Sequence, residues 1–418
     1  MTSIDSAESR SQKARLSIIV VVAALGYFVD VYDLILFGIV RAPSLRSLGY
    51  TQQADISSIG QMLFNWQMIG TLVGGVLWGV LGDRRGRVSV LYGSIILYSL
   101  ANAANGLADD VTVYAVLRFV AGVGLAGELG AGVTLVAETM DKKSRGWGTT
   151  LVASVGVCGA ALAYLVADVA DWRVAYFVGG GLGMALLALR FSTYESAMFK
   201  RVMDGAAART RLGRFDLLVA RPRRLLKYAA SIGVGLPISV SIGILMFFAD
   251  DFGKALGVTG PVTAGKAILY GYLGMAAGDL MSGLASQFLA SRRKAILIFL
   301  LASLAVVGLY LTLTGLSPGA FYALCALLGV TSGYWVLFVT MASEQFGTDI
   351  RATVTTTAPN FVRGLTVPLA ILFRAVIGSL GAAWSGFLVA AIAFAIAFAS
   401  LAYLRETFGK DLDYLEPD

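Results

Sequence analysis

The chain has no histidine and only 14% charged residues among its 418 positions. It therefore lacks the commonest side-chain metal ligand and the usual base near neutral pH, so proton transfer must use Asp, Glu, Tyr or Lys. Soluble domains carry about a quarter charged residues, which excludes an ordinary soluble protein here. Both cysteines, Cys158 and Cys325, fall in apolar stretches, so no disulfide framework is implied. We expect neither a metal nor a cofactor.

Apolar sequence is abundant, with 57% hydrophobic residues and a mean hydropathy of +0.76. A helix needs about 20 apolar residues to cross a bilayer, so hydropathy predicts an all-α polytopic membrane protein with twelve transmembrane helices. The predicted spans are 16–40, 57–81, 88–107, 112–137, 147–167, 173–190, 228–249, 266–289, 295–315, 320–343, 355–378 and 382–404. The net charge of +7 does not indicate nucleic-acid binding, because the basic residues lie in short connections.

Most Lys and Arg residues fall on one side of this predicted topology, the side that holds both chain ends. The positive-inside rule then predicts a multi-pass protein of the bacterial inner (plasma) membrane with both termini in the cytoplasm. The first apolar run is too long for the core of a cleaved signal peptide, so we expect it to stay as a span. The longest connection predicts three parts: an N-terminal six-helix bundle at 1–190, a cytoplasmic central loop at 191–227, and a C-terminal six-helix bundle with a tail at 228–418.

The two halves of the chain resemble each other. Glu138 and Arg145 close span four with the same spacing that separates Glu344 and Arg351 after span ten. A basic turn follows span two and recurs after span eight. Together these matches predict two pseudo-symmetric bundles that arose from a duplicated six-helix unit.

Four acids lie within the predicted spans. Asp30 and Asp33 share one face of span one because they are three residues apart. An ionised carboxylate at the membrane centre costs about 2.5–3.5 kcal/mol, so the pair should face partners or water inside the bundle. Glu128 and Asp279 are the other two, and Arg118 should lie at the depth of Asp33 and keep it ionised.

We interpret these four acids as candidate proton-coupling groups, with Asp30 and Glu128 preferred because they lie nearer the midplane. A static ion-pair network between spans one and four is one alternative, and direct binding of a substrate charge is another. Asp279 could carry a proton, meet a cationic ligand or belong to a helix capped by neighbouring serines.

The stretch Gly79-Val-Leu-Gly-Asp-Arg-Arg-Gly-Arg87 closes span two and opens span three. Its glycines allow two helices to approach closely, and Gly86 permits a tight turn. The stretch resembles the G-x-x-x-D-R-x-G-R signature of the major facilitator superfamily, a likeness that covers the whole chain and implies the major facilitator fold. It also implies that Asp83 meets the start of span eleven near Thr355, where the helix dipole favours an anion and the two halves would be latched. A charged turn that only obeys the positive-inside rule is the alternative.

Gating residues are expected at this signature and at the ends of spans four and ten. The candidates are Gly79, Asp83, Arg84, Gly86, Arg87, Glu138, Arg145, Glu344 and Arg351.

Spans one and four carry further motifs. Arg118-Phe-Val-Ala-Gly-Val-Gly-Leu-Ala-Gly-Glu-Leu-Gly130 resembles the R-F-x-x-G-x-G-x-G-G-E pattern of the metabolite:proton symporter, aromatic-acid and sugar-porter branches. Phe28-Val-Asp-Val-Tyr-Asp-Leu34 resembles their D-G-x-D motif, with Val31 in place of the glycine. The segment Tyr194-Glu-Ser-Ala-Met-Phe199 resembles E-S-P-x-F without its proline. These likenesses imply proton-coupled transport by alternating access.

A substrate pocket is expected near the midplane. Arg363 lies roughly 12 Å from the cytoplasmic end of span eleven at 1.5 Å per residue, so it either snorkels to that surface or faces the cavity as an anion site. The other candidate substrate-binding residues are Tyr32, Asn65, Gln67, Tyr334, Trp335 and Asn360.

We predict a secondary active transporter, monomeric, that symports a small organic anion or metabolite with protons. Its partners are then a small-molecule substrate, protons and the lipid bilayer, without nucleic acid. A proton-coupled exporter, or a transporter of an organic cation, drug or sugar, is the alternative; span five lacks the G-P-x-x-G-G turn of drug exporters, and span seven lacks the paired glutamines of sugar porters. A membrane enzyme or sensor is disfavoured, because the sequence has no catalytic constellation, no Walker sequence and no large extramembrane module.

Overall fold

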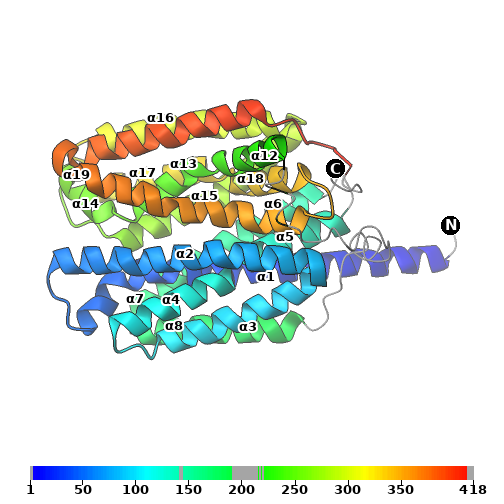
Figure 1. Ribbon diagram of the computed structural model, residues 1–418, viewed down its shortest axis with the longest axis horizontal. Helices are drawn as coiled ribbons and strands as arrows, with labels where there is room; N and C mark the ends of the chain where they lie inside the picture. The colour runs from blue at the N-terminus through cyan, green and yellow to red at the C-terminus, as the bar shows by residue number, and fades with distance from the viewer. Residues whose placement is uncertain (1–2, 141–144, 191–214, 216–217, 219–220, 412–418) are drawn as a thin grey trace.

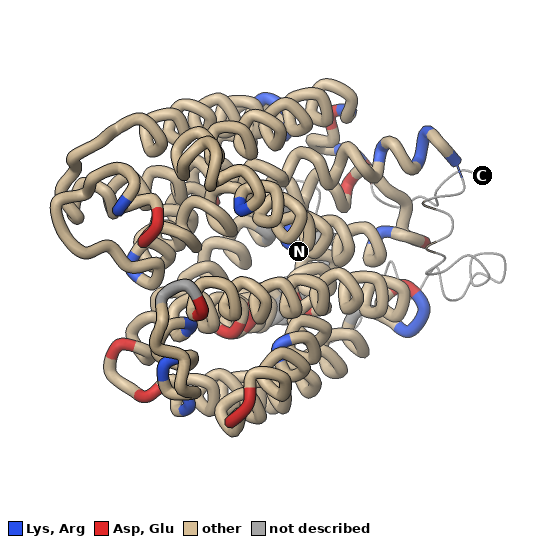
Figure 2. The backbone as a smooth tube through the Cα atoms, turned by 60° about the vertical axis from the view of Figure 1, so that its left-hand side comes forward, with Lys and Arg blue, Asp and Glu red and all other residues tan. Residues whose placement is uncertain are grey.

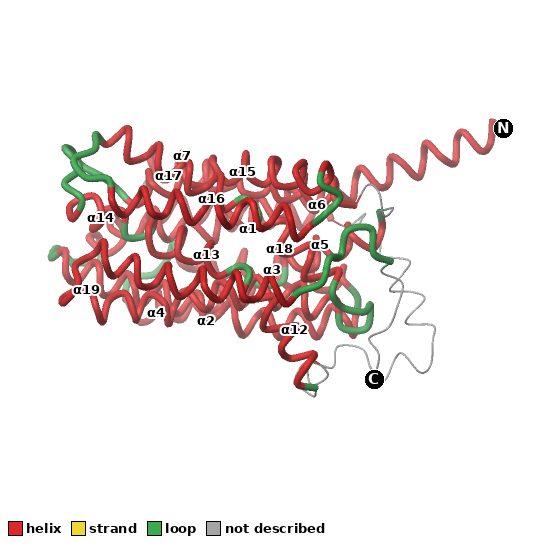
Figure 3. Tube along the Cα trace, turned by 90° about the horizontal axis from the view of Figure 1, so that it is seen from above, coloured by secondary structure: helices red, strands yellow, loops and turns green. Residues whose placement is uncertain are grey.

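The computed structural model describes residues 3–140, 145–190, 215, 218 and 221–411, and these are helical with short loops and no strand (Figure 3). The helices of the first half are α1 (Ser3–Ser47), α2 (Gln53–Arg85), α3 (Arg87–Asn105), α4 (Val111–Leu125), α5 (Glu128–Thr139), α6 (Arg145–Val157), α7 (Gly159–Val169) and α8 (Trp172–Leu189). Those of the second half are α12 (Pro222–Gly233), α13 (Leu236–Val240), the π-helical turn η2 (Ser241–Met246), α14 (Ala249–Ala255), α15 (Ala264–Phe288), α16 (Arg292–Thr312), α17 (Pro318–Ser332), α18 (Trp335–Glu344) and α19 (Arg351–Tyr403).

The two sets of helices lie side by side, with α1–α4, α7 and α8 below and α12–α19 above in Figure 1, while α5 and α6 lie against the upper set. The long helices run in one common direction, and the chain begins and ends at the same end of the molecule, which we call the terminal end. Most charged residues lie at helix ends and turns, and the middles of the helices are largely uncharged (Figure 2). This is the distribution that a bilayer-spanning bundle requires.

All twelve predicted spans are helical in the structure. Ten helical stretches within the described residues, some of them made of consecutive helices such as α4 and α5, are long and apolar enough to cross a membrane, and α15 coincides with a further predicted span. The last two predicted spans are joined in α19, where Gly381 has a φ of +74° that only glycine adopts easily and so turns the chain between them. The fold is therefore the predicted all-α polytopic one.

Several predicted spans are broken rather than continuous. Span four becomes α4 and α5, span five becomes α6 and α7, and span ten becomes α17 and α18. Span seven contains α12, α13 and the wider turn η2. Most of the predicted central loop lies outside the described residues, but its end differs from the prediction because α12 already begins at Pro222.

Close glycine contacts recur inside the two halves. A Cβ added to Gly74 of α2 would lie 2.3 Å from the carbonyl oxygen of Val123 in α4, and one added to Gly278 of α15 would lie 2.1 Å from that of Val330 in α17. The same backbone-to-backbone crossing is therefore built twice. This supports the predicted duplication, while the boundaries of the two bundles stay a prediction.

Among the described helices, the halves meet mainly where α2 packs on α19 and α6 on α15, and α5 and α7 add further contacts to α19 and α15. Here the glycines mostly face side chains: a Cβ on Gly364 would meet Leu72, and one on Gly283 would meet Thr150. The acids of α1 and the cavity described next lie between these two seams.

Candidate functional site

Helix α1 carries Asp30 and Asp33 into the interior, where both side chains are fully buried. The Oδ2 atom of Asp30 lies 3.6 Å from Nη2 of Arg363 on α19, so this ion pair joins the two halves of the molecule. Among the described residues neither oxygen of Asp30 accepts a hydrogen bond. Arg363 is thus the charge partner of Asp30, at a separation that leaves the pair loosely held.

Arg363 faces the interior rather than the membrane surface. Its side chain is 11% exposed, Nη1 donates to Oδ1 of Asn360 at 3.4 Å, and its guanidinium carbon lies 5.6 Å from the ring centroid of Trp335. Of the two predicted orientations, the structure adopts the one in which the cation points toward a cavity. The aromatic face of Trp335 supports a cation at this depth.

A cavity of about 80 Å³ lies beside this ion pair. Both halves line it, with residues Tyr27, Val31, Leu34, Ile35, Phe64, Met68, Ile238, Ser239, Ile242, Gly243, Tyr272, Met275, Trp335, Arg363 and Thr366. Its wall is mostly apolar and aromatic, with a few hydroxyl groups and one cation. Typical ligand pockets measure roughly 300–1,000 Å³, so the helices are drawn in around the cavity in this conformation. The lining suits a compact, largely apolar solute that carries one negative charge.

Asp33 and Arg118 do not form the expected ion pair. Arg118 is fully buried and donates from Nη1 to the Tyr176 hydroxyl at 3.0 Å and from Nη2 to Oδ1 of Asn102 at 3.4 Å. Within the described part of the chain, neither carboxylate oxygen of Asp33 accepts a hydrogen bond. The sequence predicted that Arg118 lies at the depth of Asp33 and pairs with it. In the structure the Arg118 side chain turns toward Tyr176 of α8 and Asn102 of α3 instead.

Glu128 is held by Arg190, the last residue of the predicted span 173–190. Nη1 of Arg190 donates to Oε2 of Glu128 at 2.9 Å, and Nη2 donates to Oε1, with both side chains 1% exposed. Gly26 of α1 makes room for the pair, because an added Cβ would lie 1.8 Å from Nη2 of Arg190 and 2.0 Å from Oε1 of Glu128. Such a bidentate pair fixes α5 to the end of α8.

Asp279 lies at the break between α17 and α18. Its Oδ1 atom accepts the backbone N–H of Val336 at 3.3 Å, in the first turn of α18, where the helix dipole favours an anion. The nearby Ser282 hydroxyl donates to the Gly333 carbonyl at 2.5 Å. Asp279 therefore anchors the start of α18.

At the terminal end, Asp83 bridges the two halves. Its carboxylate accepts the backbone N–H groups of Ala352 at 3.0 Å and Thr353 at 2.8 Å, and the Thr353 hydroxyl at 2.6 Å. These groups form the first turn of α19, so the anion meets a helix N-terminus as predicted, two to three residues before Thr355. Gly79 allows this approach, since an added Cβ would lie 2.9 Å from the Thr353 Cα atom.

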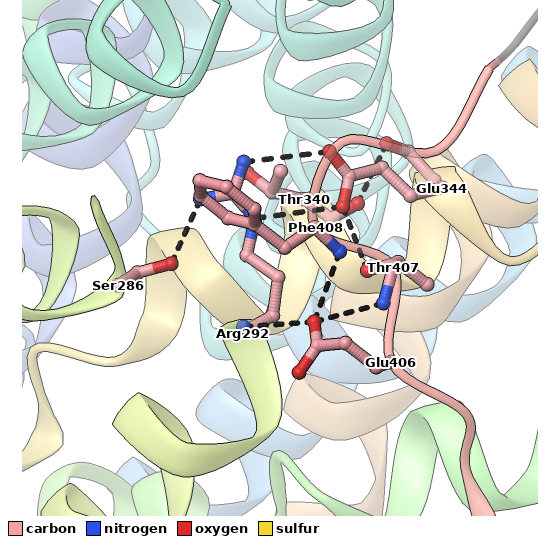
Figure 4. Close-up of polar contacts among 8 residues, drawn as sticks. Ser286, Arg292, Thr340, Glu344, Glu406, Thr407 and Phe408 are labelled. Atoms are coloured by element: carbon pink, nitrogen blue, oxygen red, sulfur yellow. Dashed lines mark hydrogen bonds and ion pairs between the residues drawn. The ribbon is translucent and has the colours of Figure 1, made fainter. Parts of the chain in front are cut away.

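A second polar network closes the terminal end of the other half (Figure 4). Arg292 at the start of α16 lies 3.5 Å from Glu344 at the end of α18, and its Nη1 donates to Ser286 at 2.8 Å. The segment after α19 joins in, because the Thr407 hydroxyl donates to Glu344 at 2.7 Å and Glu406 accepts the backbone N–H of Arg292 at 2.9 Å. The end of the described chain thus fastens α16 and α18 together.

Comparison with known proteins agrees with this geometry. The family model described as "Major Facilitator Superfamily" matches residues 18–370. The chain belongs to the major facilitator superfamily. A Haemophilus influenzae protein assigned to metabolite transport is 28% identical over 400 residues, which cover 91% of each chain. The 3-(3-hydroxy-phenyl)propionate transporter of Escherichia coli is 28% identical over 303 residues, covering 71% of this chain and 72% of that one.

The solved structure of the proton:xylose symporter XylE has the same fold. It matches with a TM-score of 0.76 at 16% identity, covering 96% of this chain and 98% of that one. The major facilitator superfamily consists of secondary transporters rather than enzymes, so this membrane-spanning chain is a secondary transporter of small molecules.

The gating positions that the superfamily signature predicts are only partly described. Gly79, Asp83 and Gly86 lie at the latch, and Arg84 is exposed beside it. Glu344 lies in the network of Figure 4, and Arg351 at the start of α19 is buried, donating to Thr348 at 3.1 Å. The side chains of Arg87, Glu138 and Arg145 lie outside the described residues, so their gating roles stay predictions.

Some of the predicted substrate-binding residues lie at the central cavity, and the others lie away from it. Trp335 and Arg363 line the central cavity, and Asn360 lies next to Arg363, where it donates to the Ala126 carbonyl across the halves at 2.8 Å. The hydroxyls of Tyr32 and Tyr334 and the amide of Gln67 instead donate to backbone carbonyls, of Ala175, Val234 and Leu34. Asn65 lines a different pocket, between α2 and Arg374.

Sequence reasoning missed three aromatic residues of the cavity and one buried cation. Tyr27, Phe64 and Tyr272 line the cavity, and Arg190 binds Glu128. Tyr27 could have been found, because it lies three residues before Asp30 and so shares its helix face. Within the described ranges, no group of three or more His, Cys, Asp or Glu side chains could hold a metal ion.

Proposed function

We propose that this chain is a proton-coupled symporter that takes up a small organic anion by alternating access. The observation that carries the proposal is the ion pair of Asp30 and Arg363, which joins the two halves beside an apolar, aromatic-lined cavity. The cavity suits a compact aromatic carboxylate, the class to which the substrate named for the Escherichia coli relative belongs. We place the protein in the bacterial inner membrane as a monomer, with both termini in the cytoplasm.

The pair supplies a direct route from anion binding to proton binding. A substrate carboxylate that binds the guanidinium of Arg363 competes with Asp30 for the same charge. Asp30 is fully buried, and a buried carboxylate without a cation is neutralised rather than left charged. Substrate binding therefore draws one proton onto Asp30, and proton binding in turn frees Arg363 for the substrate.

Neutralisation also favours movement of the two halves. When the substrate occupies Arg363 and Asp30 is protonated, the attraction that holds α1 against α19 is replaced by contacts to the substrate. A ligand shifts a conformational equilibrium only through its differential affinity for the two states, and this exchange of partners provides such a difference. The Asp83 contact with α19 would hold the cytoplasmic side closed until the substrate is bound.

We assign the proton to Asp30 rather than to the other intramembrane acids. Glu128 already receives two hydrogen bonds from Arg190, and Asp279 anchors α18. Asp33 forms no ion pair with the described cations, whereas Asp30 pairs with Arg363, which lines the cavity. Of the four acids, only Asp30 faces a cation that also lines the cavity.

The test is uptake of 3-(3-hydroxyphenyl)propionate and benzoate into proteoliposomes that contain the purified chain. With one proton per anion, a gradient of one pH unit supports about tenfold accumulation, since one unit corresponds to about 1.36 kcal/mol. Asp30→Asn should retain exchange of labelled for unlabelled substrate and lose this accumulation. Asp33→Asn is the matched control, the same change one helical turn away, and should accumulate substrate as the wild type does.

Removal of the cation should have a larger effect. Arg363→Gln leaves Asp30 unpaired and the substrate without its charge partner, so exchange and uptake should both fall about a hundredfold or more. Arg363→Lys keeps the charge and should recover part of the exchange. The proposal fails if Asp30→Asn still concentrates substrate along a pH gradient, or if Arg363→Gln exchanges carboxylates normally.

A further inference from the structure

A larger pocket opens at the end of the molecule opposite the termini, between the two halves. Its volume is about 500 Å³, and its walls come from α1 and α7 on one side and from α14 and the start of α15 on the other. The charged side chains that line it are Arg41, Arg46, Lys254, Lys266, Asp168 and Asp250. Four cations against two anions make this pocket attractive to a negatively charged solute.

Arg41 is the one of these cations that is built into the protein rather than exposed to solvent. Its side chain is 5% exposed and passes along α2, where an added Cβ on Gly60 would lie 2.5 Å from its Cδ atom. The guanidinium carbon lies 4.6 Å from the ring centroid of Phe247. Backbone and aromatic neighbours therefore fix the direction in which the guanidinium points.

The partners of Arg41 leave part of its binding capacity unused. Nη2 lies 3.8 Å from Oδ1 of Asp250, a separation too long for a hydrogen bond. Nη1 of Arg41 and Oδ1 of Asp250 both lack a hydrogen-bond partner within the described part of the chain. An arginine can bind a carboxylate through two parallel hydrogen bonds, so a stronger ligand than Asp250 fits this guanidinium.

We propose that this pocket is a second anion site, in which Arg41 releases Asp250 and binds the carboxylate of an incoming substrate before it reaches Arg363. The site rests on the proposed function, because it supplies the same class of anion to the central cavity. Arg41 belongs to α1 and Asp250 to α14, so the exchange also breaks a contact between the halves at the outer side. Capture of the anion thereby favours opening of the path to the cavity.

Two substitutions in the pair distinguish an anion site from a simple gate. The half-saturating concentration of benzoate uptake should rise about three- to tenfold in Arg41→Gln, because the guanidinium that captures the anion is lost. It should fall about two- to threefold in Asp250→Asn, because the competing carboxylate is gone while Arg41 stays. If the pair acts only as a gate, both variants move this concentration in the same direction, which overturns the proposal.

The exposed lysines should contribute through long-range attraction. In Lys254→Gln/Lys266→Gln the half-saturating concentration should rise about twofold at low salt and match the wild type at high salt, where charges farther than about 8 Å are screened. Lys294→Gln at the terminal end removes one positive charge outside the pocket and should leave the value unchanged at both salt concentrations.

A distance measurement separates failure of this site from failure of the proposed function. Spin labels on Val169→Cys and Thr259→Cys, both exposed and near the outer mouth, are placed in a variant without Cys158 and Cys325 and reconstituted in nanodiscs. Sodium benzoate should lengthen this distance in the wild-type background and in Arg363→Gln, which lacks the central site. It should have no effect in Arg41→Gln. Loss of the effect in Arg363→Gln would mean that benzoate acts only through the central site, and the outer site would be wrong.

Discussion

The two ends of the molecule close by different means. At the terminal end Asp83 accepts three hydrogen bonds from the first turn of α19 and so joins the two halves, and within the second half Glu344 is enclosed by Arg292 and the segment that follows α19. At the opposite end Arg41 and Asp250 line a pocket of about 500 Å³, and Nη2 of the arginine lies 3.8 Å from Oδ1 of the aspartate. The terminal end is therefore held by directed hydrogen bonds, and the opposite end by a weak charge contact. The difference indicates that this conformation opens more readily away from the termini.

The largest change should follow from the latch at the terminal end. Asp83→Asn replaces a charged acceptor by an amide, and hydrogen bonds to a charged group contribute about 1.5–3 kcal/mol, so the ratio of open to closed forms should rise about ten- to hundredfold. The measurement is maleimide labelling of Thr356→Cys, a position buried behind the latch, in a variant without native cysteines. Unchanged labelling would reduce the signature to a marker of topology.

A smaller change is expected at the segment after α19. Burial raises the pKa of Glu406, but hydrogen bonds from Ser291 and from the backbone of Phe408, Arg292 and Thr407 outweigh it and hold the pKa below its usual value. A depressed pKa means that the contact stabilises the folded state above pH of about 4.3 and is lost as the pH falls through the folded-state pKa.

The protection of the first turn of α16 against hydrogen exchange, measured relative to the intrinsic exchange rate at each pH, should therefore fall in acid in the wild type. Glu406→Gln should show lower protection at neutral pH and little further change in acid. Equal acid sensitivity in the two proteins would contradict the role given to this carboxylate.

The smallest change should come from the opposite end. The Arg41–Asp250 pair forms no hydrogen bond, and partly exposed pairs contribute about 0–1 kcal/mol, so Asp250→Asn should shift the population by no more than about fivefold. Ile268→Cys, buried where α15 meets Gly38 of α1, reports opening there as Thr356→Cys does at the other end. A larger shift for Asp250→Asn than for Asp83→Asn would reverse the comparison.

The sequence was sufficient to predict the helical spans and the contact of Asp83 with α19. Apolar runs predicted every span, because a bilayer permits few other ways to satisfy the backbone. The contact of Asp83 was predicted within three residues, since a helix N-terminus attracts an anion wherever the chain brings the two together.

Side-chain direction and helix breaks could not be predicted in the same way. Asp33 and Arg118 were placed at equal depth from the rise per residue, but depth gives no rotation about the helix axis, and Arg118 turns to Tyr176. Arg190 was placed at the end of a span without a partner, because hydropathy does not reveal that a charged residue there is buried against Glu128. The breaks in four spans depend on packing between distant segments, which hydropathy does not contain.

The glycine contacts divide the helix seams into two mechanical kinds. Within each half, Gly70 and Gly274 face the carbonyl oxygens of Phe119 and Ala326 at 2.2 and 2.0 Å from an added Cβ, so the partners there are rigid main chain. Between the halves, Gly79 at the terminal end also faces main chain, but Gly364 faces the side chain of Leu72, which can change rotamer. The contacts with main chain are rigid, so Gly70→Ala or Gly274→Ala should impair folding of that half. The contact with Leu72 can adjust, so Gly364→Ala should alter only the rate at which the halves move during transport.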